Sequence, residues 1–411
     1  MKSHLPLLDP LRFAAALGVA MFHQMFWSWA WTSIGVPGFE RTVAADVLYP
    51  SAAPFTWFGW VGVEIFFVIS GFVIANSASQ SSPGAFLLGR VLRLYPAVWV
   101  CATATLLVLL LFGSGPASEI ILPYIHAMLM VPKGVTGQWL DEVYWTLAAE
   151  TAFYGLVFCA MLTRKITLRH LAFGLTVYSA IFNAVALLVA SCTTPSDLPY
   201  LVILMFRVPC AAFLLSHGCF FALGIWLFIS ANRQLTALEQ VAVAVTCLSG
   251  AAEIYFFASF FLESIPAIAD QSALAPILVW AAAVLLIALA ANRNRRSAGA
   301  APEAPAYLRT LGLITYPLYL THNVIGAAII RALVDAGLDA TSALWIALGL
   351  LVLVCWFICT KIEPAIRAAL MQALMRFGTL PKRLRTPRRS VLTRGLRLPR
   401  PVAVKVNVAP S

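Results

Sequence analysis

Charged residues are scarce in this chain of 411 residues, because Asp, Glu, Lys and Arg together make up only 11% of it. A soluble domain carries about a quarter charged residues, so this scarcity excludes an ordinary cytosolic enzyme and an intrinsically disordered chain. Hydrophobic residues make up 61% of the sequence, and the mean hydropathy is +0.87. We therefore interpret the chain as a polytopic membrane protein.

Acidic residues are the scarcer sign of charge, and none follows Glu363. The 28 Lys and Arg residues exceed the 17 Asp and Glu residues, and ten of the 28 lie between Arg376 and Lys405. A basic segment of this kind is typical of a solvated cytoplasmic arm that is attracted to anionic lipid headgroups, at about 1 kcal/mol per charge. We predict a transmembrane domain at 1–370, a basic cytoplasmic tail at 371–411, and no nucleic-acid partner.

The spacings of a disulfide framework or a zinc site are also missing. Seven of the eight cysteines lie inside apolar runs, and no CxxC or His-Cys spacing is present. This pattern favours cysteines that act as small hydrophobic residues within helices. No metal is expected.

Apolar runs of about 20 residues, the length needed to cross the hydrocarbon region, recur along the chain. The first run has no early A-x-A cleavage site, so we expect it to be retained. The stretch 120–131 is apolar but only twelve residues long, which favours a re-entrant or interfacial segment. The sequence predicts an all-α bundle of about ten transmembrane helices, at 11–28, 55–76, 93–112, 144–162, 171–190, 205–229, 238–258, 274–291, 311–331 and 343–361.

Basic residues set the predicted orientation, because they fall mainly in the even-numbered connections between these runs. Arg90, Arg169, Arg233 and Arg309 are examples, whereas acidic residues such as Glu119 occupy the odd-numbered connections. By the positive-inside rule, the even connections and both termini face the cytoplasm.

Ionisable side chains inside a span cost several kcal/mol unless they are paired or face water, so each one is a candidate functional residue. Arg207 and Glu253 lie on consecutive runs and predict a structural ion pair, while the role of His217 stays open. The full set is Arg12, His23, Glu64, Glu150, Arg207, His217, Glu253 and His322.

Arg12 and His23 are separated by eleven positions, which returns a helix to nearly the same face after a rise of about 16 Å. This stripe suits an extended ligand with an anionic head at the cytoplasmic mouth and a reactive end inside the membrane. A snorkelling Arg12 and a helix-packing His23 explain the spacing equally well.

Three further patterns surround this stripe. Arg90 and Arg93 lie one helical turn apart and suit a phosphate clamp, although topology anchors explain them better when they are taken alone. Glu150 or Glu64 is a candidate for orienting a histidine and stabilising its imidazolium. Tyr316, Tyr319 and His322 repeat at i, i+3, i+6, which indicates either a polar face of the bundle interior or interhelical hydrogen bonding.

Several segments, taken in order, resemble the acyltransferase-3 family of integral membrane O-acyltransferases. The opening span is similar at LDPLRFAAALGVAMFH (8–23), where an Arg is followed after ten residues by a His. The other segments are GVEIFFVISGFVI at 62–74, RVLRLYPA at 90–97, YWTLAAETAFY at 144–154, FFALGIWL at 220–227 and ITYPLYLTHNVI at 314–325.

The resemblance implies a ten-helix bundle in the inner membrane that uses cytoplasmic acyl-CoA, usually acetyl-CoA, to acylate a hydroxyl of a cell-envelope or exported glycan. It implies no permanently bound cofactor. His23 would act as general base or carry the acyl group transiently, with Glu150 or Glu64 orienting it. Arg12, Arg90 and Arg93 would contact the CoA phosphates, and Asp9, Ser70, Trp145, Tyr319 and His322 would support the site.

A transporter or flippase for a lipid-linked glycan is the alternative, because intramembrane charges can also line a translocation path. The spans show no obvious inverted repeat and no paired helices broken by Gly or Pro. Ligand binding distinguishes the two functions, since only the enzyme requires CoA.

Overall fold

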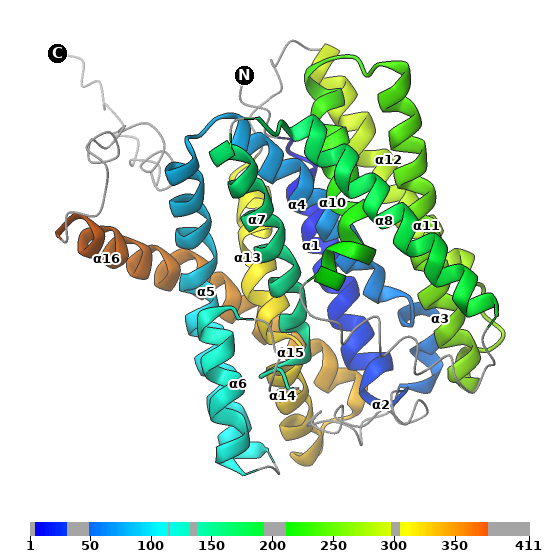
Figure 1. Cartoon of the computed structure of the whole chain (residues 1–411). Helices are drawn as coiled ribbons and strands as arrows, with labels where there is room; N and C mark the ends of the chain where they lie inside the picture. The colour runs from blue at the N-terminus through cyan, green and yellow to red at the C-terminus, as the bar shows by residue number, and fades with distance from the viewer. Residues whose placement is uncertain are drawn as a thin grey trace, which may run out of the picture. The chain divides into compact units, whose positions relative to one another are not determined.

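The computed structural model describes residues 5–30, 49–113, 116–131, 138–163, 165–192, 211–296 and 305–376. Every regular element in these ranges is a helix (Figure 1). The chain divides into two compact units, Met1–Ala365 and Ile366–Ser411. The predicted basic tail beyond Arg376 lies outside the described residues, so the boundary at 370 stays a prediction.

The helices of the first unit follow one another with short connections. The amino-terminal half contains α1 (Leu8–Met21), η1 (Phe22–Trp27), α2 (Ser28–Ala30), η3 (Pro50–Ala52), α3 (Ala53–Thr56), η4 (Gly59–Val61), α4 (Gly62–Ser79), α5 (Pro83–Phe112), α6 (Ala117–Leu129), η5 (Glu142–Tyr144), α7 (Trp145–Thr163) and α8 (Leu168–Ser191). The remainder contains α10 (Ala211–Asn232), α11 (Ala237–Ser264), η6 (Pro266–Ile268), α12 (Leu274–Arg296), α13 (Ala306–Thr321), α14 (Val324–Asp335), α15 (Ala340–Phe357) and η7 (Ile358–Ile362), and α16 (Glu363–Arg376) continues into the second unit.

Among the described residues, eight helical segments are long and apolar enough to cross a membrane. A ninth results if α13 and α14, which are bent by 75° at their junction, count as one span. The remaining predicted span corresponds to Leu8–Ala30, which is helical throughout but carries Asp9, Arg12 and His23. The all-α membrane fold is confirmed, and the cytoplasmic position of the termini stays a prediction.

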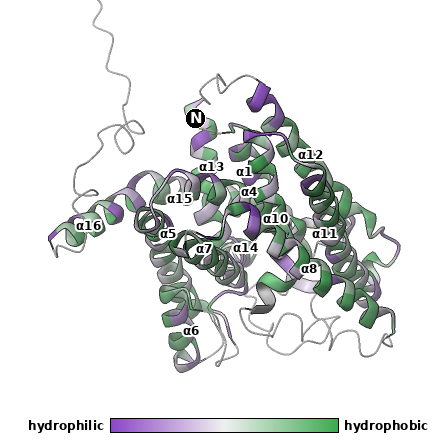
Figure 2. Ribbon diagram, turned by 45° about the horizontal axis from the view of Figure 1, so that its top comes forward, coloured by the Kyte–Doolittle hydropathy of each residue, from purple (hydrophilic) through white to green (hydrophobic). Residues whose placement is uncertain are grey.

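Large apolar side chains point outward as well as inward, as expected for helices that face lipid. Leu111, Leu248 and Leu278 are 74%, 71% and 66% exposed. Hydrophobic residues dominate the helices in Figure 2, whichever way their side chains point. Because lipid tails are as apolar as leucine, the bundle must be held by close packing and polar contacts rather than by hydrophobic burial.

Helices α4 and α10 form the centre of the bundle. The apolar window of α10 is 83% buried and that of the segment ending in α4 is 67% buried, whereas the corresponding figure for α8 and α12 is 28%. The two central helices cross at Gly71 and Gly224, where a Cβ on Gly224 would lie 2.1 Å from the Val68 carbonyl oxygen. Small residues are needed here because they let the backbones approach closely.

Helix α1 packs against α4 on one side and α13 on the other. A Cβ on Gly62 of α4 would lie 2.6 Å from the Ala15 carbonyl oxygen, and one on Gly312 of α13 would lie 2.3 Å from an oxygen of Asp9. The predicted stripe of α1 is therefore held at a fixed position against α13.

Helix α6 is the short apolar element expected at 120–131, and it has 13 residues. It packs on α5, where the Trp99 indole Nε1 donates to the Met128 carbonyl at 3.1 Å and Tyr95 Oη donates to the Leu129 carbonyl at 3.3 Å. Its length leaves it too short to cross the bilayer.

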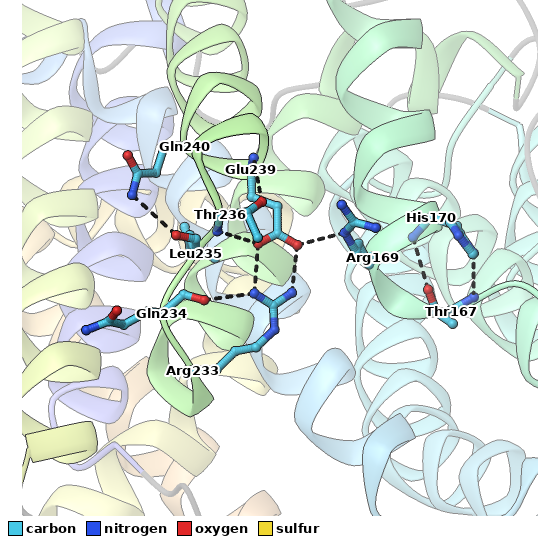
Figure 3. A network of polar contacts seen from close by, with 9 residues as sticks. All are labelled: Thr167, Arg169, His170, Arg233, Gln234, Leu235, Thr236, Glu239 and Gln240. Atoms are coloured by element: carbon cyan, nitrogen blue, oxygen red, sulfur yellow. Dashed lines mark hydrogen bonds and ion pairs between the residues drawn. The ribbon is translucent and has the colours of Figure 1, made fainter.

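A cluster of charges ties the adjoining ends of α8, α10 and α11 together (Figure 3). The buried Glu239 carboxylate contacts Arg169 Nε at 2.7 Å and Arg233 Nη2 at 2.6 Å. Glu239 also forms a capping box with Thr236 at the start of α11. Burial of this carboxylate is compensated by two guanidinium groups from neighbouring segments.

Candidate active site

His23 lies in η1, a stretch of π-helix that interrupts the first span. The π-helix covers Phe22–Trp27 and follows α1 directly. Such interruptions are frequent at functional sites, because they free backbone groups and turn side chains away from the regular helical positions. The imidazole of His23 is half-buried, and its edge contacts the ring of Phe22.

His322 lies at the bend between α13 and α14, and its side chain is fully buried. The sequence analysis predicted a single span at 311–331, but helix α13 ends at Thr321 and α14 begins at Val324. Polar side chains compensate for the broken hydrogen-bond ladder: Gln24 Nε2 donates to the carbonyls of His322 and Asn323. The bend places the His322 ring against His23.

The two histidine rings are joined by a hydrogen bond between His322 Nε2 and His23 Nδ1, at 3.1 Å. His322 Nδ1 lies 2.8 Å from the Tyr319 carbonyl oxygen, which can only accept, so this nitrogen carries the proton of the neutral ring. His322 Nε2 is then an acceptor. His23 Nδ1 donates to it and to the Val19 carbonyl at 3.0 Å, which leaves His23 Nε2 as the unprotonated nitrogen.

The three predicted arginines come from α1 and α5. Arg12 lies 3.7 Å from Asp9 and interacts electrostatically with Arg93, and the side chains of Arg12 and Arg93 are 25% and 30% exposed. Arg93 Nη1 lies 3.7 Å from the buried Glu363. The expected proximity of Arg12 to the arginine pair is therefore present.

Arginine donors at this site remain available to a ligand. Arg90 Nε and Arg93 Nη1 are buried with no hydrogen-bond acceptor within the described ranges. Arg90 reaches Ser77 through a long contact of 3.4 Å from Nη2 to Oγ. Buried guanidinium donors without acceptors are costly, and phosphate oxygens would satisfy them.

Glu150 belongs to this arginine group rather than to the histidine pair. Its Oε1 accepts hydrogen bonds from Tyr154 Oη and, at 3.2 Å, from Ser70 Oγ. Glu150 and Tyr154 interact electrostatically with Arg12, and the Arg90 guanidinium lies 5.9 Å from the centre of the Tyr154 ring. Across the described residues, the partner that we find for His23 is His322 and not Glu150, whose role stays a prediction.

One face of α13 connects the arginines to the histidines. The Arg93 guanidinium lies 5.6 Å from the centre of the Tyr316 ring, and Tyr319 lies one turn further along, with its ring 5.6 Å from that of His322. The i, i+3, i+6 stripe predicted from the sequence thus runs from the arginine group to His23.

Two other predicted residues lie in a different cluster. Glu64 is grouped with His217 and Glu253, and Trp145 packs against the His217 ring at 5.2 Å between centroids. The partner of Glu253 in the described structure is His217, at 2.5 Å. Arg207, the partner predicted for Glu253, lies outside the described residues.

Sequence reasoning missed Gln24, Asp141 and Asn323, which hold the bend in place. Asp141 accepts a hydrogen bond from Asn323 Nδ2 at 2.8 Å and another from the Val324 backbone N–H at 3.2 Å. The signal was the polar pair His322–Asn323 inside an otherwise apolar run. Polar residues at that position indicate a helix break that needs partners.

Comparison with known proteins follows from this geometry. The sequence model of the acyltransferase-3 family, described as an acyltransferase domain, matches residues 6–361 and so includes both histidines and the three arginines. Nodulation protein 10 of Rhizobium leguminosarum bv. viciae is 33% identical over 150 residues, which cover 36% of this chain and 36% of that protein. No solved structure matches the chain significantly. The extent of the family match shows that the chain belongs to the acyltransferase-3 family.

Proposed function

We propose that this protein transfers an acyl group, acetyl in the simplest case, from cytoplasmic acyl-CoA to a hydroxyl of a cell-envelope or exported glycan. The observation that carries the proposal is the continuous face of α13, with arginines near Tyr316 and the histidine pair at His322. The inner membrane is the compartment in which such a protein would meet both substrates.

The donor would bind with its phosphates at the arginine group. Arg12, Arg90 and Arg93 supply three guanidinium groups, and two of them hold buried donors without acceptors among the described residues. Planar guanidinium donors match phosphate oxygens in pairs. The pantetheine arm would then extend along α1 and α13, since Arg12 and His23 are about 16 Å apart along the helix.

The acyl transfer itself uses the free nitrogen of His23. His23 Nε2 takes the proton from the acceptor hydroxyl while the hydroxyl oxygen attacks the thioester carbonyl carbon. The tetrahedral intermediate collapses with cleavage of the carbon–sulfur bond, and the imidazolium returns the proton to the departing thiolate. The products are an ester and free CoA.

His322 would act as a positioning residue in this sequence. Its Nε2 accepts from His23 Nδ1–H, so it holds the tautomer that presents Nε2 as the base. A general base contributes typically about 10²- to 10⁴-fold to the rate. The remaining acceleration comes from holding thioester and hydroxyl together in a site screened from water.

The test uses the full chain in lipid nanodiscs with acetyl-CoA that is radiolabelled in the acetyl group. The acceptor is envelope polysaccharide from a strain that lacks the protein. We expect label in the polysaccharide with wild-type protein, loss of about 10²-fold or more in His23→Ala, and full activity in His170→Ala, a matched histidine variant outside the site.

Transfer at the wild-type rate by His23→Ala would contradict the general-base mechanism. Wild-type protein that moves glycan across the membrane without acetyl-CoA would favour the transport alternative. Mass spectrometry of surface glycans from the two strains then identifies the acyl group by its mass increment.

A further inference from the structure

A second group of ionisable side chains lies away from the candidate active site. Glu64 of α4, His217 of α10 and Glu253 of α11 each present one ligand atom, and these atoms lie within 4.8 Å of one another. The three residues are only 3%, 3% and 2% exposed. Three helices that are distant in sequence therefore converge on one point with two carboxylates and one imidazole.

Hydrogen bonds within the described structure do not satisfy this group. Glu64 Oε2 is buried without a hydrogen-bond partner, and the same holds for His217 Nδ1 and Glu253 Oε1 apart from their mutual contact at 2.5 Å. The other carboxylate oxygen of Glu253, Oε2, is 3.6 Å from Cys219 Sγ. The unpartnered oxygen of Glu64 is the atom for which the protein supplies no counterpart.

The surroundings of this group are apolar. The His217 ring packs against Phe67 and Trp145, with centroids 5.6 Å and 5.2 Å away. Two adjacent carboxylates in such surroundings cannot both stay ionised without a compensating positive charge. A dication would neutralise both carboxylates and leave the imidazole neutral, which is the form that binds metals.

We propose that Glu64, His217 and Glu253 bind a divalent first-row transition metal ion such as Zn²⁺. One imidazole nitrogen and two carboxylate oxygens form a donor set that zinc accepts, with a further position left for water or another ligand.

The spacing of the donors is compatible with this assignment. Donor atoms around a tetrahedral zinc ion at 2.0–2.2 Å lie about 3.4 Å apart. That value falls between the 2.5 Å of the His217–Glu253 contact and the 4.8 Å limit of the group. Binding therefore requires His217 and Glu253 to separate by about 1 Å, which rotation of the Glu253 carboxylate provides.

The role of the ion would be structural. It would join the two central helices, α4 and α10, to α11, and so fix the helix that packs against α1. This inference does not depend on the acyl-transfer reaction.

The test measures metal in the full chain, purified with a tag that contains no histidine and held in lipid nanodiscs. Elemental analysis for zinc, manganese and iron should give about one ion per chain in total. Glu64→Gln, which preserves side-chain volume, and His217→Ala should lose most of that metal, and the control His170→Ala should keep it. Chelation should lower the melting temperature of the wild type, and added Zn²⁺ should restore it.

Wild-type protein that holds no more metal than Glu64→Gln and His217→Ala would overturn the proposal. A melting temperature that chelation leaves unchanged in metal-depleted wild type would overturn it as well. If His217→Ala fails to fold, the comparison of wild type with Glu64→Gln still decides, because metal content is measured independently of activity.

Discussion

His322 Nε2 lies 3.1 Å from His23 Nδ1, and this contact determines which nitrogen of His23 is free. The partner of the proposed base is thus a second imidazole, held in turn by the Tyr319 carbonyl. A neutral ring orients His23 without placing a negative charge beside the thioester. It also stabilises an imidazolium less than a carboxylate would.

Removal of the His322 ring should slow acyl transfer without abolishing it. A hydrogen bond to a charged group contributes about 1.5–3 kcal/mol, so we expect His322→Ala to lower kcat by about 10- to 100-fold. The KM for acyl-CoA should change little, because the arginine group is separate from this contact. Steady-state kinetics on nanodisc-embedded protein measures both constants.

The double variant tests whether the two histidines act as one unit. His23→Ala combined with His322→Ala should be no slower than His23→Ala alone, because His322 acts through His23. His322→Gln should restore part of the rate and shift its pH profile, since its amide oxygen accepts from His23 Nδ1–H. Additive losses in the double variant would contradict a positioning role.

Loss of either clamp arginine should weaken donor binding. Arg90→Ala and Arg93→Ala each remove a guanidinium from the proposed phosphate site, and we expect CoA to bind about 10- to 100-fold more weakly. Arg309→Ala is the charge-matched control, because Arg309 is exposed and predicted to be cytoplasmic. Equal CoA affinity in Arg90→Ala, Arg93→Ala and Arg309→Ala would place the donor phosphates elsewhere.

Periodicity was enough to predict the part of the site that regular helices carry. The spacing of Arg12 and His23 placed them on one stripe, and the i, i+3, i+6 pattern placed Tyr316, Tyr319 and His322 on one face; both are present. These predictions succeed because an unbroken helix fixes the relative direction of its side chains.

The contacts between helices could not be derived in the same way. Glu150 was expected beside His23 because both were placed at similar depth, yet it contacts Tyr154 and Ser70. The bend at His322 moves this ring to the place intended for a carboxylate. Depth along the membrane normal does not determine which helices are neighbours, so a pairing between helices needs three-dimensional information.

Neutralising Glu239 should destabilise the bundle without changing its chemistry. Glu239→Gln removes the carboxylate that Arg169 and Arg233 share, and the two arginines are 42% and 46% exposed. After allowance for solvent screening, we expect a loss of about 1–2 kcal/mol in the free energy of unfolding. Glu263→Gln, at an exposed position, is the matched control.

Salt provides an independent check of this ion pair. The difference in stability between wild type and Glu239→Gln should shrink as ionic strength rises, because exposed guanidinium groups are screened. Denaturant titration of nanodisc or micelle samples at low and high salt measures the difference. A salt-independent loss would assign the effect to packing.

The close crossing of α4 and α10 should tolerate no side chain. In Gly224→Ala the new Cβ would lie 2.1 Å from the Val68 carbonyl oxygen and 2.6 Å from the Phe72 backbone nitrogen, and neither backbone atom can move independently. The helices must separate, and we expect a loss of about 3 kcal/mol or more in the free energy of unfolding. Gly155→Ala in α7 is the matched control, because a Cβ there meets nothing within 4 Å, and it should gain up to about 1 kcal/mol from helix propensity. Since α4 also carries Ser70, the hydrogen-bond partner of Glu150, the folded fraction of Gly224→Ala should show weaker CoA binding than Gly155→Ala. Equal stability of the two alanine variants would show that α4 and α10 do not pack through these glycines.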